Sequence, residues 1–223
     1  MPLPKDHPDW QQISECYRVL KKAKSNVVWE ILRQSPPFVQ WDHYPKGDVY
    51  DRDTHAQYYY HAHPRISAEN NPEENGHFHL FLRKKGIPES IQPQDIDRRD
   101  RPEDSKEDDI CHVIGIAMDK YGFPTHLFTT NRWVTGESWY KAEDVISLLD
   151  YFNIDHSYPS WPLNLWLSSM VRLYRDEIAA LILKRDETII NWQAAHPDKN
   201  VYEDRRLEVL SILTLCGPSD FHT

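Results

Sequence analysis

The sequence predicts an α+β fold in which a small antiparallel sheet of two hairpins is covered by N-terminal and C-terminal helices. Near both ends of the chain, apolar residues recur at three- and four-residue steps, which is the helical period. The central part instead holds short runs rich in aromatic and β-branched residues, which are typical of strands. The order of helix, strands and helices fits a layer of helices packed on one sheet.

We interpret the whole chain, residues 1–223, as a single domain, because this length stays within what one hydrophobic core can organise. Hydrophobic residues make up 39% of it, and eight Trp, twelve Tyr and seven Phe supply rings whose burial offsets chain entropy. The expected parts are an N-terminal helical segment (1–35), a β core (55–130) and C-terminal helices (141–215).

The N-terminal helical segment is expected to begin at Pro8, because proline suits the first helical turn. Apolar residues from Trp10 to Leu20 follow the helical period, and the pattern ends before Pro36-Pro37, where a helix cannot continue. Residues 38–54 are aromatic and acidic without a clear period. We therefore expect a structured loop there.

Four strands are expected in the β core, at residues 56–63, 77–82, 111–118 and 125–130. The first two can pair across residues 64–76, and the last two across a turn around Gly122, which gives two hairpins. Between the hairpins, residues 87–109 carry prolines and a dense mixture of both charges, a composition typical of a solvated, mobile loop.

The C-terminal part is predicted to be helical after a loop at residues 131–140. Helical periods cover residues 141–152, then 161–195 with a break, and then 201–215. These helices would cover one face of the sheet.

The composition excludes several function classes. The formal net charge is −9 and no Lys/Arg cluster stands free of acidic neighbours, which argues against nucleic acid as a partner. Seven glycines form no phosphate-binding loop. Residues 1–10 lack the apolar core of a secretory signal, and no apolar run reaches membrane-spanning length. We therefore expect a cytoplasmic protein with no membrane partner.

Four histidines in the first predicted hairpin are the main chemical feature: His61, His63, His77 and His79. Residues two apart in a strand point to the same face, so each pair projects together. If the strands pair antiparallel, opposed residues lie about 4.5–5.5 Å apart, and the imidazoles can share one ion at metal–nitrogen distances of about 2.0–2.1 Å. This predicts a mononuclear metal site. The alternative is that the histidines are half-buried rings stacked on tyrosines.

The nature of the donors bears on the metal. Imidazole-rich sites suit iron, copper, nickel or zinc, and the three cysteines (Cys16, Cys111, Cys216) are too far apart for a CxxC zinc site. Our hypothesis is an oxidoreductase with a histidine-ligated iron or copper centre and a small-molecule substrate. A zinc-dependent hydrolase and a non-catalytic metal-binding or interaction protein are the alternatives. A carboxylate such as Glu69, Glu74 or Asp51 can support the ligands.

Further residues are candidates for contacts with a substrate. Tyr59 shares the histidine face and can donate a hydrogen bond to a bound ligand, with packing as the alternative role. Arg132, in a polar and aromatic run, suits a carboxylate substrate, with an ion pair to Glu137 or an aspartate as the alternative. His112 and His126, on the second hairpin, are interpreted as core residues.

Several short motifs are spread along most of the chain. They are Trp41, His61-Ala62-His63, Gly76-His77-Phe78-His79, the run from Leu127 to Trp139 that includes Thr129-Thr130-Asn131-Arg132-Trp133, and Pro159-Ser160-Trp161-Pro162. With them the chain resembles a bacterial family catalogued as a domain of unknown function. The resemblance implies a bacterial origin and assigns no activity.

Overall fold

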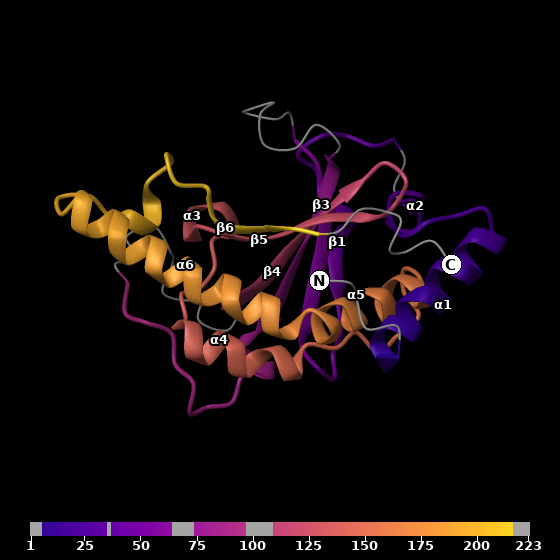
Figure 1. Cartoon of the computed structure of the whole chain (residues 1–223), viewed down its shortest axis with the longest axis horizontal. Coiled ribbons are helices and arrows are strands. Elements are labelled where there is room, and N and C mark those ends of the chain that lie inside the picture. Colours follow the sequence, from indigo (N-terminus) through magenta and orange to yellow (C-terminus); the bar gives the residue numbers. More distant parts are fainter. Residues whose placement is uncertain (1–5, 35–36, 64–73, 97–108, 216–223) are drawn as a thin grey trace.

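The computed structural model describes residues 6–34, 37–63, 74–96 and 109–215. In this part of the chain, six strands form one antiparallel sheet whose spatial order follows the sequence (Figure 1). The strands are β1 (Tyr44–Tyr50), β2 (Ala56–His61), β3 (Glu74–Arg83), β4 (Ile110–Asp119), β5 (Pro124–Thr130) and β6 (Val209–Thr214). The fold is therefore α+β with an antiparallel sheet, as predicted, and the two expected hairpins are its central part.

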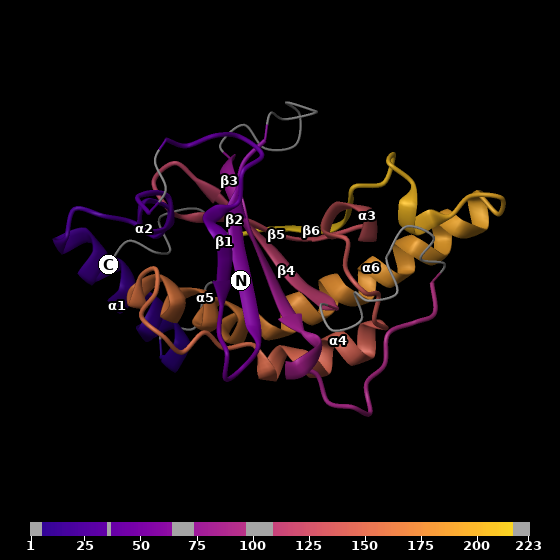
Figure 2. The same ribbon diagram turned by 180° about the vertical axis from the view of Figure 1, so that it is seen from behind.

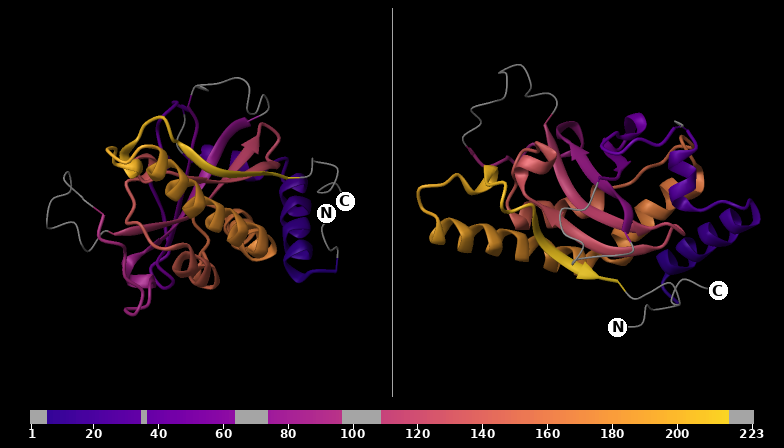
Figure 3. Two further views of the ribbon diagram at one scale, coloured as in Figure 1. Left: turned by 60° about the vertical axis from the view of Figure 1, so that its left-hand side comes forward. Right: turned by 90° about the horizontal axis from the view of Figure 1, so that it is seen from above.

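The helices are α1 (Pro8–Lys22), α2 (Val27–Leu32), α3 (Arg132–Thr135), α4 (Ala142–Leu148), α5 (Trp161–Leu173) and α6 (Arg175–Ala195). The chain also has short 3-10 turns at η1 (Lys84–Gly86), η3 (Leu149–Tyr151) and η4 (Val201–Glu203). The longer helices form one layer against the sheet, with α1 and α6 at its two ends (Figure 3). Among the residues described, no helix has the length and apolar character needed to cross a membrane.

Helix α1 begins where the sequence predicts. Pro8 occupies its first turn, and the His7 side chain accepts a hydrogen bond from the backbone N–H of Asp9. Its buried face, which includes Trp10 and Ile13, packs against α5. The expected N-terminal helical segment is thus confirmed as two helices, α1 and α2.

The main core lies between the sheet and the helical layer. Tyr58 and Tyr60 of β2 and Phe78 of β3 point toward the helices and are fully buried, as is Trp166 of α5. The rings of Phe78 and Trp166 lie 6.2 Å apart, centroid to centroid. Because side chains alternate along a strand, the residues between these rings face the opposite side of the sheet. Seen from behind, β1, β2 and β3 lie in front of α4 and α5 (Figure 2).

One buried amide joins β2 to the helical layer. The hydroxyl of Tyr58 donates to Asn164 Oδ1 of α5 at 2.5 Å, and Asn164 Nδ2 donates to the carbonyl oxygens of His156 and Tyr158 at 2.7 and 2.9 Å. Asn164 is fully buried, so protein groups rather than water satisfy its side chain. This amide fixes the start of α5 against the strand that carries His61.

The expectation of a loop over residues 38–54 is wrong in part, because Tyr44–Tyr50 forms strand β1. β1 is an edge strand that pairs only with β2, and its register shifts between Tyr44 and Val49. An edge position with an irregular register tolerates Pro45 and Gly47, residues that weaken a regular strand pattern. For this reason the sequence of β1 shows no alternation of apolar and polar residues.

The predicted helix over residues 201–215 is also wrong. The structure has the 3-10 turn η4 at Val201–Glu203 and then strand β6, which pairs with β5 along Val209–Thr214. The apolar run in β6 is short, and short runs do not distinguish a strand from a buried helix. Residues 209–214 form a strand because they pair with the edge of β5 that β4 leaves free.

The remaining expectations agree more closely. The break in the long C-terminal helix falls at Tyr174, between α5 and α6, and the segment 141–152 is α4 followed by η3. The expected loop at 131–140 contains the single helical turn α3. Of the charged loop at 87–109, residues 97–108 lie outside the described part of the chain.

Candidate metal centre

The register of β2 and β3 brings the first hairpin's histidines together. His61 lies directly opposite His77, and Tyr59 lies directly opposite His79. The Nε2 atoms of His61 and His77 are 2.6 Å apart. The ring of His63 lies 5.5 Å from that of His61 and 5.3 Å from that of His77, between centroids. The predicted antiparallel pairing is therefore confirmed.

These three histidines have the geometry of a metal site. One nitrogen each from His61, His63 and His77 lies within 4.8 Å of the others. Metal–nitrogen bonds of about 2.0–2.1 Å in a tetrahedral site place ligand nitrogens about 3.3 Å apart, so small side-chain movements bring the three nitrogens onto one ion. His61, His63 and His77 can thus hold a metal ion.

His79, the fourth predicted ligand, lies beside this triad. Its ring centroid is 5.0 Å from that of His77 and 5.2 Å from that of His61, and the side chain is almost fully buried. Its Nδ1 lies 3.0 Å from Nε2 of His112 on β4, whereas its buried Nε2 has no hydrogen-bond partner within the described part of the chain. Ligation by His79 stays a prediction.

Burial keeps the imidazoles of His61, His79 and His112 neutral at neutral pH. Desolvation, followed by the charge of His77, lowers the pKa of His61 to about 2. Desolvation also lowers the pKa of His79 well below its usual value. For His112, desolvation and the nearby Arg185 lower the pKa to about 3. Neutral imidazole is the form that binds metal ions, so His61 and His79 have the protonation state that a ligand needs at neutral pH.

A phenylalanine ring covers part of the centre because β4 has a glycine beneath it. Gly115 lies opposite His79 on one side and opposite Phe128 on the other. A Cβ atom at Gly115 would collide with the ring of Phe128. Without that atom, Phe128 lies across β4 and presents its ring to His77 and His79 at 5.4 and 5.7 Å. The inner side of the centre is therefore apolar.

Tyr59 lies on the histidine side of β2, where the sequence placed it. Its ring stacks on His43, with centroids 3.7 Å apart and planes 8° apart, and it also packs against Phe81. Burial raises the pKa of its hydroxyl above the usual value. These contacts favour packing, and a catalytic role for Tyr59 stays a prediction.

Sequence reasoning missed two histidines of this cluster. His43 lies just before β1, stacks on Tyr59, and has its Nδ1 3.2 Å from Asp48 Oδ1. It was overlooked because the segment around it was taken for a loop. His112 was interpreted as a core residue, which its burial confirms, but its contact with His79 was not predicted. The sequence offered one signal for this contact: His112 is the second residue of a predicted strand of the same β core.

The outer side of the centre includes an exposed aromatic residue. The indole of Trp41 stacks on the ring of His63, with centroids 4.7 Å apart and planes 15° apart, and 61% of Trp41 is exposed. His61 and His63 are only half-buried, in contrast to His77. A small molecule can therefore approach the triad from the side of His61 and His63.

Of the three carboxylates suggested as supporting groups, Asp51 is the one whose side chain is described, and it does not belong to the triad. Asp51 instead accepts hydrogen bonds from the backbone N–H groups of Asp53, Thr54 and Asp155, so it holds a turn in place. Glu69 and the side chain of Glu74 lie outside the described part of the chain.

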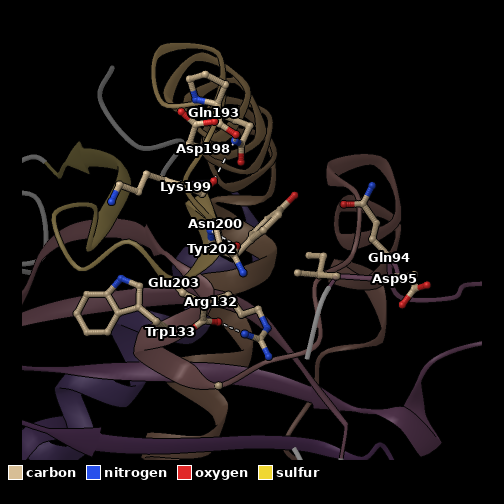
Figure 4. Close-up of a pocket in the computed structure, with 13 residues that line it drawn as sticks. Gln94, Asp95, Arg132, Trp133, Gln193, Asp198, Lys199, Asn200, Tyr202 and Glu203 are labelled. Carbon is tan, nitrogen blue, oxygen red and sulfur yellow. Dashed lines mark hydrogen bonds and ion pairs between the residues drawn. The ribbon is translucent and has the colours of Figure 1, made fainter. Parts of the chain in front are cut away.

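Arg132 lies in a separate groove of about 1200 Å³ (Figure 4). Its guanidinium forms an ion pair with Glu203, a partner that differs from the Glu137 or aspartate suggested from the sequence. The groove is lined by α3, the end of α6 and residues 94–96, and the four predicted ligands are not among its lining residues so far as the chain is described. The structure therefore does not bring Arg132 together with the histidines.

Glu137 is a buried carboxyl group next to the cluster. It accepts a hydrogen bond from the backbone N–H of His112 at 2.8 Å and one from the Thr135 hydroxyl at 3.3 Å. Desolvation raises its pKa to about 7, even though Arg185 and these hydrogen bonds act in the opposite direction. Near neutral pH, therefore, Glu137 is protonated in a substantial fraction of molecules.

We expect Glu137 to make stability fall as the pH rises. Between about pH 4.5 and 7 the unfolded chain releases this proton while the folded protein still holds it, which favours unfolding. The free energy of unfolding of the wild type, relative to Glu137→Gln, should fall by about 3 kcal/mol from pH 4 to pH 8. Urea denaturation at both pH values measures this difference, and a constant difference would contradict the assignment.

Fold and site together define an α+β protein with a histidine triad that can hold a metal ion. The chain belongs to the family described as a domain of unknown function, DUF6969, whose profile matches residues 7–215. No curated protein and no solved structure matches the chain. The family was expected from the sequence motifs, and the match does not add an activity.

Proposed function

We propose that the protein is a metal-dependent oxidoreductase with a mononuclear, histidine-ligated iron or copper centre that acts on a small-molecule substrate. The observation that carries the proposal is the convergence of ligand nitrogens from His61, His63 and His77. Among the described residues no carboxylate or thiolate belongs to this group, so the donor set is all nitrogen. Such donors suit copper and iron, and a bound ion would supply electron transfer with the substrate.

The surrounding residues fit such a site. Three protein ligands leave coordination positions open for a substrate, and an iron or copper ion that takes five or six ligands keeps an open position with a fourth histidine as well. The Phe128 ring covers the inner side, and the half-buried rings of His61 and His63 leave the outer side accessible. In this proposal the Tyr59 ring supports the ligands by packing against His61 and His79, and its hydroxyl can turn toward a bound molecule.

A substrate contact by Arg132 is a weaker part of the hypothesis. The guanidinium is already paired with Glu203 in the separate groove. That ion pair favours the alternative role, which is to hold α3 against η4.

A zinc-dependent hydrolase is the second candidate, because three histidines with an open position are also a catalytic zinc arrangement. The bound ion would then activate water instead of transferring electrons. The identity of the tightly bound metal separates the two candidates, since zinc has no accessible redox change. A non-catalytic metal-binding protein would hold the ion without accepting an external ligand.

Elemental analysis of protein purified without a nickel column tests the proposal. We expect about one iron or copper ion per chain in the wild type. The double variant His61→Ala, His77→Ala should hold none, and His196→Ala, which removes a histidine at the end of α6, should keep the full amount. Absence of stoichiometric metal from the wild type, also after incubation with each ion, would overturn the proposal.

Binding of an external ligand separates an enzyme from a structural site. Azide or nitric oxide should change the optical or paramagnetic resonance spectrum of the loaded protein, because an open position accepts it. An unchanged spectrum would mean that the ion is saturated by protein ligands, and the enzyme proposal would fail while metal binding stands.

A further inference from the structure

One nitrogen of the buried His79 ring lacks a hydrogen bond within the described part of the chain. Among the residues that the structure describes, no group forms a hydrogen bond with its buried Nε2, although this atom lies among the rings of His61 and His77. A buried polar atom left without a partner costs about 1–3 kcal/mol. Nearly all such atoms in folded proteins find a protein, water or ion partner, so this atom marks a place where a ligand is expected.

The other nitrogen of the same ring is held in place. His79 Nδ1 lies 3.0 Å from Nε2 of His112, and Nδ1 of His112 lies 3.5 Å from the hydroxyl oxygen of Thr130. In a neutral imidazole, one nitrogen donates and the other accepts. The three groups therefore form a chain whose proton positions are linked, and only two arrangements of the protons are consistent with it.

The two arrangements differ in what they leave at His79 Nε2. If His112 donates to His79, then His79 Nε2 carries a proton that is buried without an acceptor. If His79 donates to His112, and His112 donates to Thr130, then His79 Nε2 presents a lone pair. Only the second arrangement gives all four nitrogens of His79 and His112 a partner when a cation lies beside His61 and His77.

We infer that His112 is a positioning residue for the metal centre: by accepting the Nδ1–H of His79, it fixes the tautomer in which His79 Nε2 serves as a fourth nitrogen ligand. This inference rests on the proposed function, because it needs a metal ion at the triad. Histidine ligands commonly donate their second N–H to a neighbouring acceptor, which fixes the ring and increases its basicity. Here the acceptor is a second imidazole on the adjacent strand.

The position of His112 depends on an irregularity in the sheet. The register of β3 and β4 shifts between Leu80 and Phe81, so that His112 pairs with Phe81 while Gly115 pairs with His79. His112 is also held from behind, because its backbone N–H donates to the buried Glu137 carboxyl group. The position of His112, which accepts the hydrogen bond from His79, is thus fixed by the register of β3 and β4 and by the hydrogen bond to Glu137.

The test compares variants of His112 by copper affinity and by the copper resonance spectrum. His112→Phe keeps a ring but removes the acceptor, and we expect it to weaken Cu²⁺ binding about 10- to 100-fold. The nitrogen hyperfine pattern should then show one coordinated nitrogen fewer than in the wild type. His112→Gln retains an acceptor oxygen, so it should restore both the affinity and the nitrogen count.

A matched control separates positioning from packing. Phe81→Leu disturbs the same neighbourhood, because the Phe81 ring packs against both His79 and His112, yet it removes no hydrogen bond. It should lower thermal stability and leave the copper spectrum unchanged.

The outcomes also separate this inference from the proposed function. If the wild type binds no metal, the proposed function fails and the inference falls with it. If the wild type binds copper, but His112→Phe has the same affinity and the same nitrogen count, the inference alone is overturned. A loss of thermal stability in His112→Phe with an unchanged spectrum likewise overturns it.

Discussion

Adding Cu²⁺ or Zn²⁺ to metal-free protein should raise the midpoint of thermal unfolding by about 8–16 °C. An ion at about 1,000 times its dissociation constant stabilises the folded state by about 4 kcal/mol, if the unfolded chain does not bind it. For a chain of this size, each kcal/mol corresponds to about 2–4 °C. The triad of His61, His63 and His77 exists only in the folded state, so the linkage applies. Calorimetry after treatment with a chelator measures the shift.

Two variants act as controls for this shift. In the double variant His61→Ala, His77→Ala, which removes two of the three ligands, the ion should leave the midpoint nearly unchanged. In His196→Ala the full shift should remain, because His196 caps the far end of α6. An equal shift in all three proteins would mean that the ion binds elsewhere.

Replacing Asn164 by alanine should lower the free energy of unfolding by about 3–6 kcal/mol. The variant leaves the buried Tyr58 hydroxyl and the partly buried carbonyl oxygens of His156 and Tyr158 without their partner. Each such loss costs about 1–3 kcal/mol, and partial access of water reduces the sum. Urea denaturation measures the effect as a lower midpoint at an unchanged slope.

A double-mutant cycle with Tyr58→Phe checks the cause. Alone, Tyr58→Phe should cost about 1–2 kcal/mol, because it leaves one lone pair of Asn164 Oδ1 unsatisfied. Combined with Asn164→Ala it should cost much less, since the partner is already gone. Strictly additive effects would show that the two side chains are not coupled.

The histidine pairs could be predicted from the sequence because their signal is local. The spacing of His61 with His63 and of His77 with His79 sets the face on which each pair projects, and neighbouring strands of a hairpin pair antiparallel. The α+β class and the N-terminal helices also follow from local periodicity.

The rest of the site depends on pairing between distant segments, which no local pattern reveals. His112 reaches His79 only because β3 pairs with β4 across an irregular register. His43 joins the cluster through β1, an edge strand whose proline and glycine hide its period. Strand β6 was mistaken for a helix because the partner that makes it a strand, β5, lies far away in the sequence.

The triad is also close together along the chain, which has a consequence for how the protein is made. His61 and His77 are 16 residues apart, whereas Thr129 and Ser211, which join β5 to β6, are 82 apart. Contacts over short separations restrict little chain and form early in folding, and hairpins form within microseconds. The three histidines of the triad are therefore synthesised, and able to pair as a hairpin, before the C-terminal strand that completes the sheet.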